Sequence, residues 1–203
     1  MGVSPHLAPL EALGLTTPNV TRLAAYLDTL GAWGRRINLT GARTPGERVE
    51  RLVAAVLPVA AVPEPGTLID VGSGNGSPGL VLALLRDDLQ VTLLEPRMRR
   101  WAFLREAARS AGRPEIRVLR SRHDAYAGEP ARTVTVRALA LPLGELQPLL
   151  RPAGQVVVLG RPPVLHAAFE PRAEACGGRP DVHVFRLRGT LVPRGTPGSD
   201  QEH

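Results

Sequence analysis

The segment from Asp70 to Gly79 constrains the fold more than any other part of the chain. It reads Asp-Val-Gly-Ser-Gly-Asn-Gly-Ser-Pro-Gly. Residues 67–71 before it form a short apolar run, as expected for a strand buried on both faces. Residues 79–86 after it are apolar and helical in character, and Pro78 suits the first turn of a helix. Because glycines permit a tight turn and a close approach of backbone to ligand, the segment predicts a ligand-binding turn.

Strands and helices alternate through the rest of the chain. The sequence predicts further strands at 91–95, 116–119, 133–137 and 155–159, helices at 97–111 and 143–150, a turn at 152–154, and weaker strands at 182–187 and 190–192. This alternation predicts an α/β fold, Rossmann-like, with a mostly parallel sheet and helices on both faces.

Two amphipathic helices are predicted before the first strand. Thr17 and Pro18 are typical of a helix start, and apolar residues follow at near-helical spacing as far as Ile37. Thr44 and Glu47 have the spacing of a capping box, and the apolar residues after them share one helical face: Val49, Leu52, Val53 and Val56. We therefore expect a helical extension over residues 1–64, a catalytic domain over 65–193, and a disordered polar tail over 194–203.

Composition limits the class of partner and the compartment. All 25 basic side chains are arginines and the net charge is +6, which suits a nucleic-acid partner but is equally typical of biased codon usage. Cys176 is the single cysteine, and no cysteine cluster suggests a metal site. No segment is apolar enough for a signal peptide or a membrane span. We therefore expect a cytoplasmic protein with no metal and no membrane association.

The glycine-rich turn alone leaves the cofactor open. Gly74, Gly76 and Gly79 satisfy the dinucleotide pattern G-x-G-x-x-G, and Glu95 at the next strand end suits the ribose of either NAD or S-adenosylmethionine. A carboxylate at Asp70 suits a ligand that carries an ammonium group and would repel a pyrophosphate. This favours S-adenosylmethionine, while a dehydrogenase and a purely structural turn stay as alternatives.

The order of several motifs resembles the bacterial RsmG (GidB) family over about residues 23–159. The matching pieces are Trp33, Asn38-Leu39-Thr40, Asp70 to Gly79, Leu93-Leu94-Glu95, Arg99 to Arg105, Ser121-Arg122-His123-Asp124, Val136 to Ala140, and Leu149 to Gly154. The resemblance implies a class I S-adenosylmethionine-dependent methyltransferase that modifies guanine N7 in the 530 loop of 16S ribosomal RNA. Its expected partner is that RNA or the small ribosomal subunit, and we expect a monomer.

The resemblance also implies roles for individual residues. Gly72 and Ser77 would contact the cofactor, His123 and Asp124 would flank its adenine, and Arg137 would lie beside cofactor and RNA. With the residues of the turn, the predicted cofactor site comprises Asp70, Gly72, Gly74, Ser77, Glu95, His123, Asp124 and Arg137. Arg137 is the candidate catalytic residue, as a group that holds a phosphate or guanine O6. No general base is expected, because guanine N7 has a free lone pair and no proton.

The chain departs from the family pattern at three places. The family usually has a His and an Asp-Ser pair where this chain has Arg51, Ala54 and Ala55. It usually has a large apolar residue at the position of Ser77, and a Lys-Gly pair near residue 160, where Arg161 is the nearest cation. These departures leave two alternatives open: a methyltransferase with a different RNA or small-molecule acceptor, and a non-catalytic RNA-binding or ribosome-binding relic.

Overall fold

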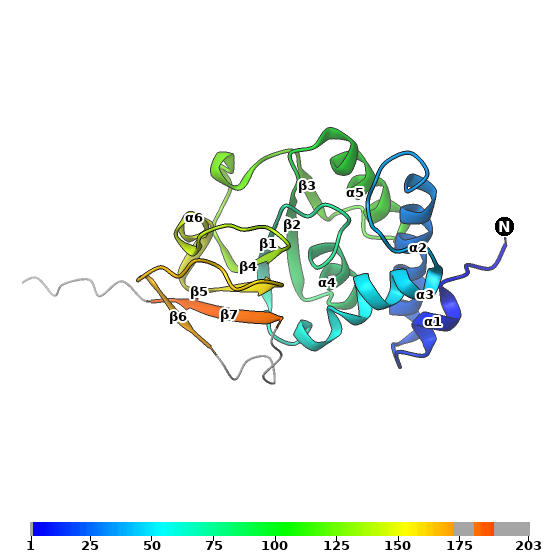
Figure 1. Cartoon of the computed structure of the whole chain (residues 1–203), viewed down its shortest axis with the longest axis horizontal. Coiled ribbons are helices and arrows are strands. Elements are labelled where there is room, and N and C mark those ends of the chain that lie inside the picture. The colour runs from blue at the N-terminus through cyan, green and yellow to red at the C-terminus, as the bar shows by residue number, and fades with distance from the viewer. Residues whose placement is uncertain (1, 173–180, 189–203) are drawn as a thin grey trace, which may run out of the picture.

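A single seven-stranded sheet forms the centre of the computed structural model, which describes residues 2–172 and 181–188 (Figure 1). Its strands lie in the order β3-β2-β1-β4-β5-β7-β6. The strand bounds are β1 (Gly66–Val71), β2 (Leu89–Leu94), β3 (Arg117–Leu119), β4 (Ala131–Arg137), β5 (Leu150–Leu159), β6 (Phe169–Pro171) and β7 (Val182–Leu187). Strands β1 to β5 are parallel, and β7 and β6 add an antiparallel edge. The strand order reverses between β1 and β4, which is where open α/β sheets bind their ligands.

Helices cover the two faces of the sheet unequally. The helical segments are α1 (Leu7–Glu11), α2 (Thr17–Trp33), α3 (Pro45–Arg48), the π-helical η1 (Val49–Ala54), α4 (Gly79–Leu85), α5 (Met98–Ser110), α6 (Leu143–Leu146), and the 3-10 turns η2 (Leu57–Val59), η3 (His123–Ala125) and η4 (Gln147–Leu149). Helix α2 packs against both α4 and α5, while α6 lies across the sheet from them (Figure 1). Only the short η3 and no α-helix connects β3 to β4. The predicted doubly covered, mostly parallel sheet is confirmed.

The amino-terminal helices share one hydrophobic core with the sheet. Leu23 and Leu27 of α2 belong to the same buried cluster as Leu80 of α4 and Phe103 of α5. The four apolar residues predicted to share a helical face after Thr44 are all buried: Val49, Leu52, Val53 and Val56. A second cluster fills the face beneath α6. Residues before β1 therefore complete the core on one face of the sheet.

Several predicted boundaries differ from the structure. Thr16 is the N-cap residue of α2, without a capping hydrogen bond from its side chain, and the helix ends at Trp33, so Ile37 lies beyond it. The predicted turn at 152–154 lies inside β5, where Ala153 has a positive φ of 57° and the pairing with β4 shifts register. Two residue steps in β4, from Ala131 to Thr133, face five in β5, from Leu150 to Gln155, so the three extra residues form a bulge that bends the strand without ending it. The sequence interpretation missed α1 and β6, and Cys176, the weak strand at 190–192 and the tail lie outside the described residues.

Candidate functional site

The glycine-rich turn follows β1 at the point where the strand order reverses. Gly72, Gly74 and Gly76 have positive φ angles of 70°, 52° and 95°, which side chains other than glycine rarely adopt. At Gly72 a methyl group would also lie 2.3 Å from Cδ1 of Leu139. Glycine at this position therefore allows both the turn and the approach of the Leu139 side chain.

Glu95 ties this turn to the end of β2. Its carboxylate is 3% exposed, and its two oxygens accept hydrogen bonds from the backbone N–H of Gly74 at 3.0 Å and of Arg97 at 2.8 Å. A carboxylate has about four lone-pair positions, so Glu95 can accept further hydrogen bonds from ligand hydroxyls.

A cavity of about 220 Å³ opens beside Gly72 and Glu95. Its lining combines apolar and cationic side chains with one imidazole: Val71, Gly72, Glu95, Pro96, Arg97, Arg100, Ser121, Arg122, His123, Leu139 and Leu141. His123 is buried and its Nε2 lies 2.9 Å from a carboxylate oxygen of Glu145, so its ring orientation is fixed. The cavity thus presents an apolar wall, a carboxylate and a rim of arginines.

Asp70 lies under the turn and does not line the cavity. It is 1% exposed, its Oδ1 accepts a hydrogen bond from the Thr135 hydroxyl at 2.6 Å, and its Oδ2 has no hydrogen-bond partner among the described residues. Burial raises the pKa of the Asp70 carboxyl to about 6, and the hydrogen bond from Thr135 opposes this rise only in part. Its side chain packs directly against Gly79, where any Cβ would lie 2.6 Å or less from it.

Arg137 and Ser77 meet on the other side of the turn. One guanidinium nitrogen of Arg137 donates to Ser77 Oγ at 2.5 Å, and another donates to the carbonyl oxygen of Arg51 at 2.8 Å. Burial lowers the pKa of Arg137 from its usual value. Neither Arg137 nor Ser77 lines the cavity beside Glu95.

The structure therefore divides the predicted site residues into groups. Gly72, Glu95 and His123 line one cavity, and Gly74 contacts it through Glu95. The remaining predicted residues lie elsewhere: Asp70 beneath the turn, Ser77 and Arg137 on its far side, and Asp124 exposed in an ion pair with Arg122.

Sequence reasoning did not single out three side chains that shape this region: Leu139, Tyr26 and Asn75. Leu139 is 43% exposed and lies against Gly72. Tyr26 is fully buried and donates to the carbonyl oxygen of Asn75 at 2.7 Å, and the Asn75 amide donates to that of Leu39. Leu39, Asn75 and Leu139 stand in motifs that the sequence shows, but their spacing gives no sign that Asn75 contacts Leu39 or that Leu139 contacts Gly72.

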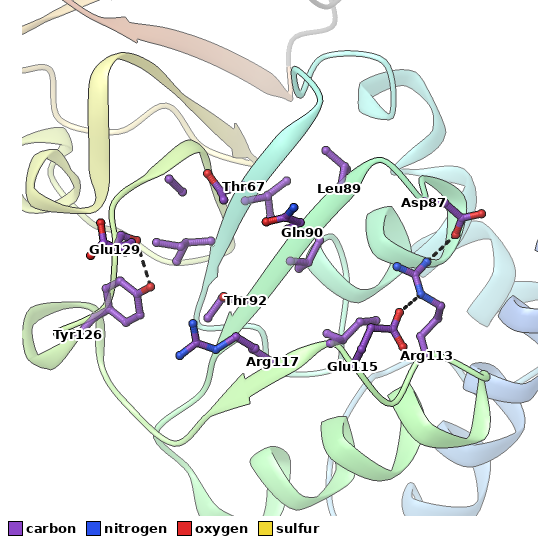
Figure 2. Close-up of a pocket in the computed structure, with 15 residues that line it drawn as sticks. Thr67, Asp87, Leu89, Gln90, Thr92, Arg113, Glu115, Arg117, Tyr126 and Glu129 are labelled. Atoms are coloured by element: carbon purple, nitrogen blue, oxygen red, sulfur yellow. Dashed lines mark hydrogen bonds and ion pairs between the residues drawn. The ribbon is translucent and has the colours of Figure 1, made fainter.

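A larger cavity, about 370 Å³, lies away from the turn (Figure 2). It opens over β1 and β2, where Figure 2 shows Gln90, Thr92 and Arg117 along the strands and the hydrogen-bonded Tyr126 to one side. Neither the glycine-rich turn nor any predicted site residue borders it. Its existence follows from the short β3–β4 connection, which leaves this part of the sheet without a covering α-helix.

Comparison with known proteins identifies the family. The family model for rRNA small subunit methyltransferase G (GidB) matches residues 19–161. A ribosomal RNA small subunit methyltransferase G from Alkalilimnicola ehrlichii is 38% identical, over 81% of this chain and 78% of its own length. One from Thermobifida fusca is 37% identical, over 96% of this chain and 83% of its own. The chain belongs to the rRNA small subunit methyltransferase G family. This membership confirms the predicted family, the methyltransferase class and S-adenosylmethionine as methyl donor.

Solved structures agree on the fold. TrmN from Thermus thermophilus superposes with a TM-score of 0.52 at 23% identity, over 74% of this chain and 51% of that chain. The putative methyltransferase yhhF from Escherichia coli gives 0.51 at 20% identity, over 75% and 92%. At these identities the likeness supports the methyltransferase fold alone.

The residues around the cavity fit S-adenosylmethionine. Gly72 presents backbone without a Cβ, Glu95 keeps free lone pairs for ribose hydroxyls, and Leu139 and Leu141 give an apolar wall suited to an adenine ring. Within residues 2–172 and 181–188, no cluster of side chains could hold a metal ion, and no helix is long and apolar enough to cross a membrane.

Proposed function

We propose that this chain methylates N7 of a guanosine in the 530 loop of 16S ribosomal RNA, acting in the cytoplasm on the RNA or the small subunit. The observation that carries the proposal is the family match over residues 19–161, which includes the glycine-rich turn, the cavity beside Glu95 and Arg137. The names of these relatives specify a ribosomal RNA of the small subunit as the substrate of those proteins.

Each part of the site has one task in this reaction. Gly72, Glu95 and His123 would hold the cofactor in the cavity, with Gly74 and Asp70 fixing the turn from below. When bound, S-adenosylmethionine supplies an electrophilic methyl group on its sulfonium. Since guanine N7 needs no deprotonation, the protein has to align the two reactants and exclude water. Arg137, half-buried at the carboxyl end of β4, would hold an RNA phosphate or the guanine O6.

The test is transfer of radiolabelled methyl from S-adenosylmethionine to small subunits that lack the N7 methyl group of the 530 loop. Methylated subunits are the control, and protein-free 16S RNA is a separate arm. Label confined to the unmethylated particles or RNA, and mapped to that guanosine, is the expected result. Absence of label together with calorimetric binding of S-adenosylmethionine would move the acceptor elsewhere, and absence of both would favour a non-catalytic relic.

A further inference from the structure

The Arg137 guanidinium is held by two elements other than its own strand. It extends from the end of β4 to Ser77, in the turn before α4, and to the backbone of Arg51 in η1. Ser77 Oγ in turn donates to the carbonyl oxygen of Leu52 at 2.8 Å. The hydroxyl of Ser77 thus links β4 with η1.

The direction of these hydrogen bonds is determined by chemistry. A carbonyl oxygen can only accept, so the single hydroxyl proton of Ser77 points at Leu52. A guanidinium can only donate, so the lone pairs of Ser77 Oγ face Arg137. No alternative arrangement of the hydroxyl satisfies both neighbours, and Ser77 is only 5% exposed, so solvent offers little replacement.

The Asp181 and Asp70 carboxylates stabilise the charge on Arg137 electrostatically, but neither accepts the hydrogen bonds that Arg137 makes among the described residues. Its acceptors there are a hydroxyl and a carbonyl, both neutral. A half-buried cation whose hydrogen bonds go to neutral acceptors keeps an attraction for an anion, and RNA phosphate is the anion that the proposed reaction brings to this edge of the sheet. The function of the hydrogen bonds is then to fix the direction of the guanidinium before RNA arrives.

We propose that Ser77 is a positioning residue that acts on the RNA substrate through Arg137. The inference rests on the proposed function, because it takes an RNA phosphate as the ligand of Arg137. Ser77 does not line the cavity beside Glu95, so its hydroxyl controls RNA binding and leaves cofactor affinity unchanged.

A double-mutant cycle tests this coupling. Ser77→Ala, Arg137→Gln and the double variant are compared with the wild type for methylation of unmethylated small subunits at several salt concentrations. Thr29→Val is the control, since Thr29 also donates from a partly buried hydroxyl to a carbonyl, but within α2. We expect Ser77→Ala to raise KM for subunits about tenfold with kcat within about twofold, as loss of one charged contact would. S-adenosylmethionine affinity should stay within about twofold.

Two readouts separate positioning from a merely structural role. The slope of log KM against log salt should fall by about one in Ser77→Ala and in Arg137→Gln, because each loses the same phosphate contact. In the Arg137→Gln background, Ser77→Ala should have no further effect. Additive effects, an unchanged salt slope, or a loss of cofactor affinity in Ser77→Ala would each overturn the inference. Failure of the wild type to methylate subunits would instead overturn the proposed function, and this inference with it.

Discussion

The two sides of the glycine-rich turn are built in different ways. The cavity side uses strand ends and short loops that lie near one another in the sheet, such as Glu95 after β2 and His123 after β3. The Arg137 side depends on contacts between distant segments: Tyr26 bonds a residue 49 positions away, and Arg137 bonds one 86 positions away. We infer that strand ends, with α5, determine most of the cofactor side, whereas contacts from the amino-terminal helices determine the side proposed for RNA.

Glu95→Ala should have the largest effect and should act on the cavity side. It leaves the buried N–H of Gly74 without an acceptor, at about 1–3 kcal/mol, and it removes both the partly buried hydrogen bond from the N–H of Arg97 and the proposed ribose contact. We expect S-adenosylmethionine affinity to fall about 100-fold or more and methylation to be lost, measured by calorimetry and by methyl transfer. Glu11→Ala, an exposed carboxylate on α1, is the matched control. If Glu95→Ala keeps cofactor affinity within twofold of wild type, Glu95 does not bind the cofactor.

Asp70→Asn probes the base of the turn through the pH dependence of stability. The pKa of Asp70 is raised from 3.8 to about 6 in the folded state, so the folded chain binds this proton more tightly than the unfolded chain. The stability from this group is therefore full below pH 3.8 and lost as pH rises through about 6. At neutral pH the folded state is therefore about 3 kcal/mol less stable than it is at low pH, as far as this group is concerned.

The asparagine variant should lack this contribution while keeping an oxygen that can accept from Thr135. Urea unfolding at pH values from about 4 to 8 should show the wild type losing about 2–3 kcal/mol relative to Asp70→Asn. Parallel stability profiles for the two proteins would mean that the buried carboxyl carries no raised pKa.

The difference between the two sides also explains what the sequence could predict. Strand ends in a parallel sheet meet at one edge, so a Gly-rich turn after β1 and Glu95 after β2 had to lie close together. Nothing comparable links Ser77 to Leu52 or Tyr26 to Asn75, because those contacts follow from tertiary packing of helices against the sheet.

Local chemistry was predictable only where it did not depend on tertiary contacts. The Thr44 hydroxyl does accept from the N–H of Glu47, as the capping pattern indicated, although the Glu47 side chain bonds the N–H of Arg43 instead. Pro-Ala-Gly is typical of a turn, so the sequence alone predicts one at residues 152–154, whereas the structure has a register shift there. The strand pairs with β4 at Leu150 and again from Gln155 onward, so β5 continues past this bulge.

Tyr26→Phe should have the smallest effect and sharpens the comparison most. The Tyr26 hydroxyl bonds Asn75, which lies in the turn itself, yet Tyr26 comes from α2 and lines no part of the cofactor cavity. Its loss should cost about 1 kcal/mol, or about 2–4 °C in Tm for a chain of this size, by thermal unfolding. Tyr126→Phe is the matched control, since its hydroxyl also donates to a carbonyl, that of Glu129, but on an exposed surface.

If the two sides are independent, Tyr26→Phe should raise KM for small subunits about twofold to threefold, a free-energy change of about 0.5 kcal/mol, with cofactor affinity unchanged. The reason lies in the contacts of the Asn75 side chain, which donates to the carbonyl oxygen of Leu39 and accepts from the N–H of Ser77. A displacement of Asn75 should therefore move Ser77 more than Gly72. If cofactor affinity falls by the same factor as the affinity for subunits, the whole turn shifts together, and the amino-terminal helices support both sides of the site.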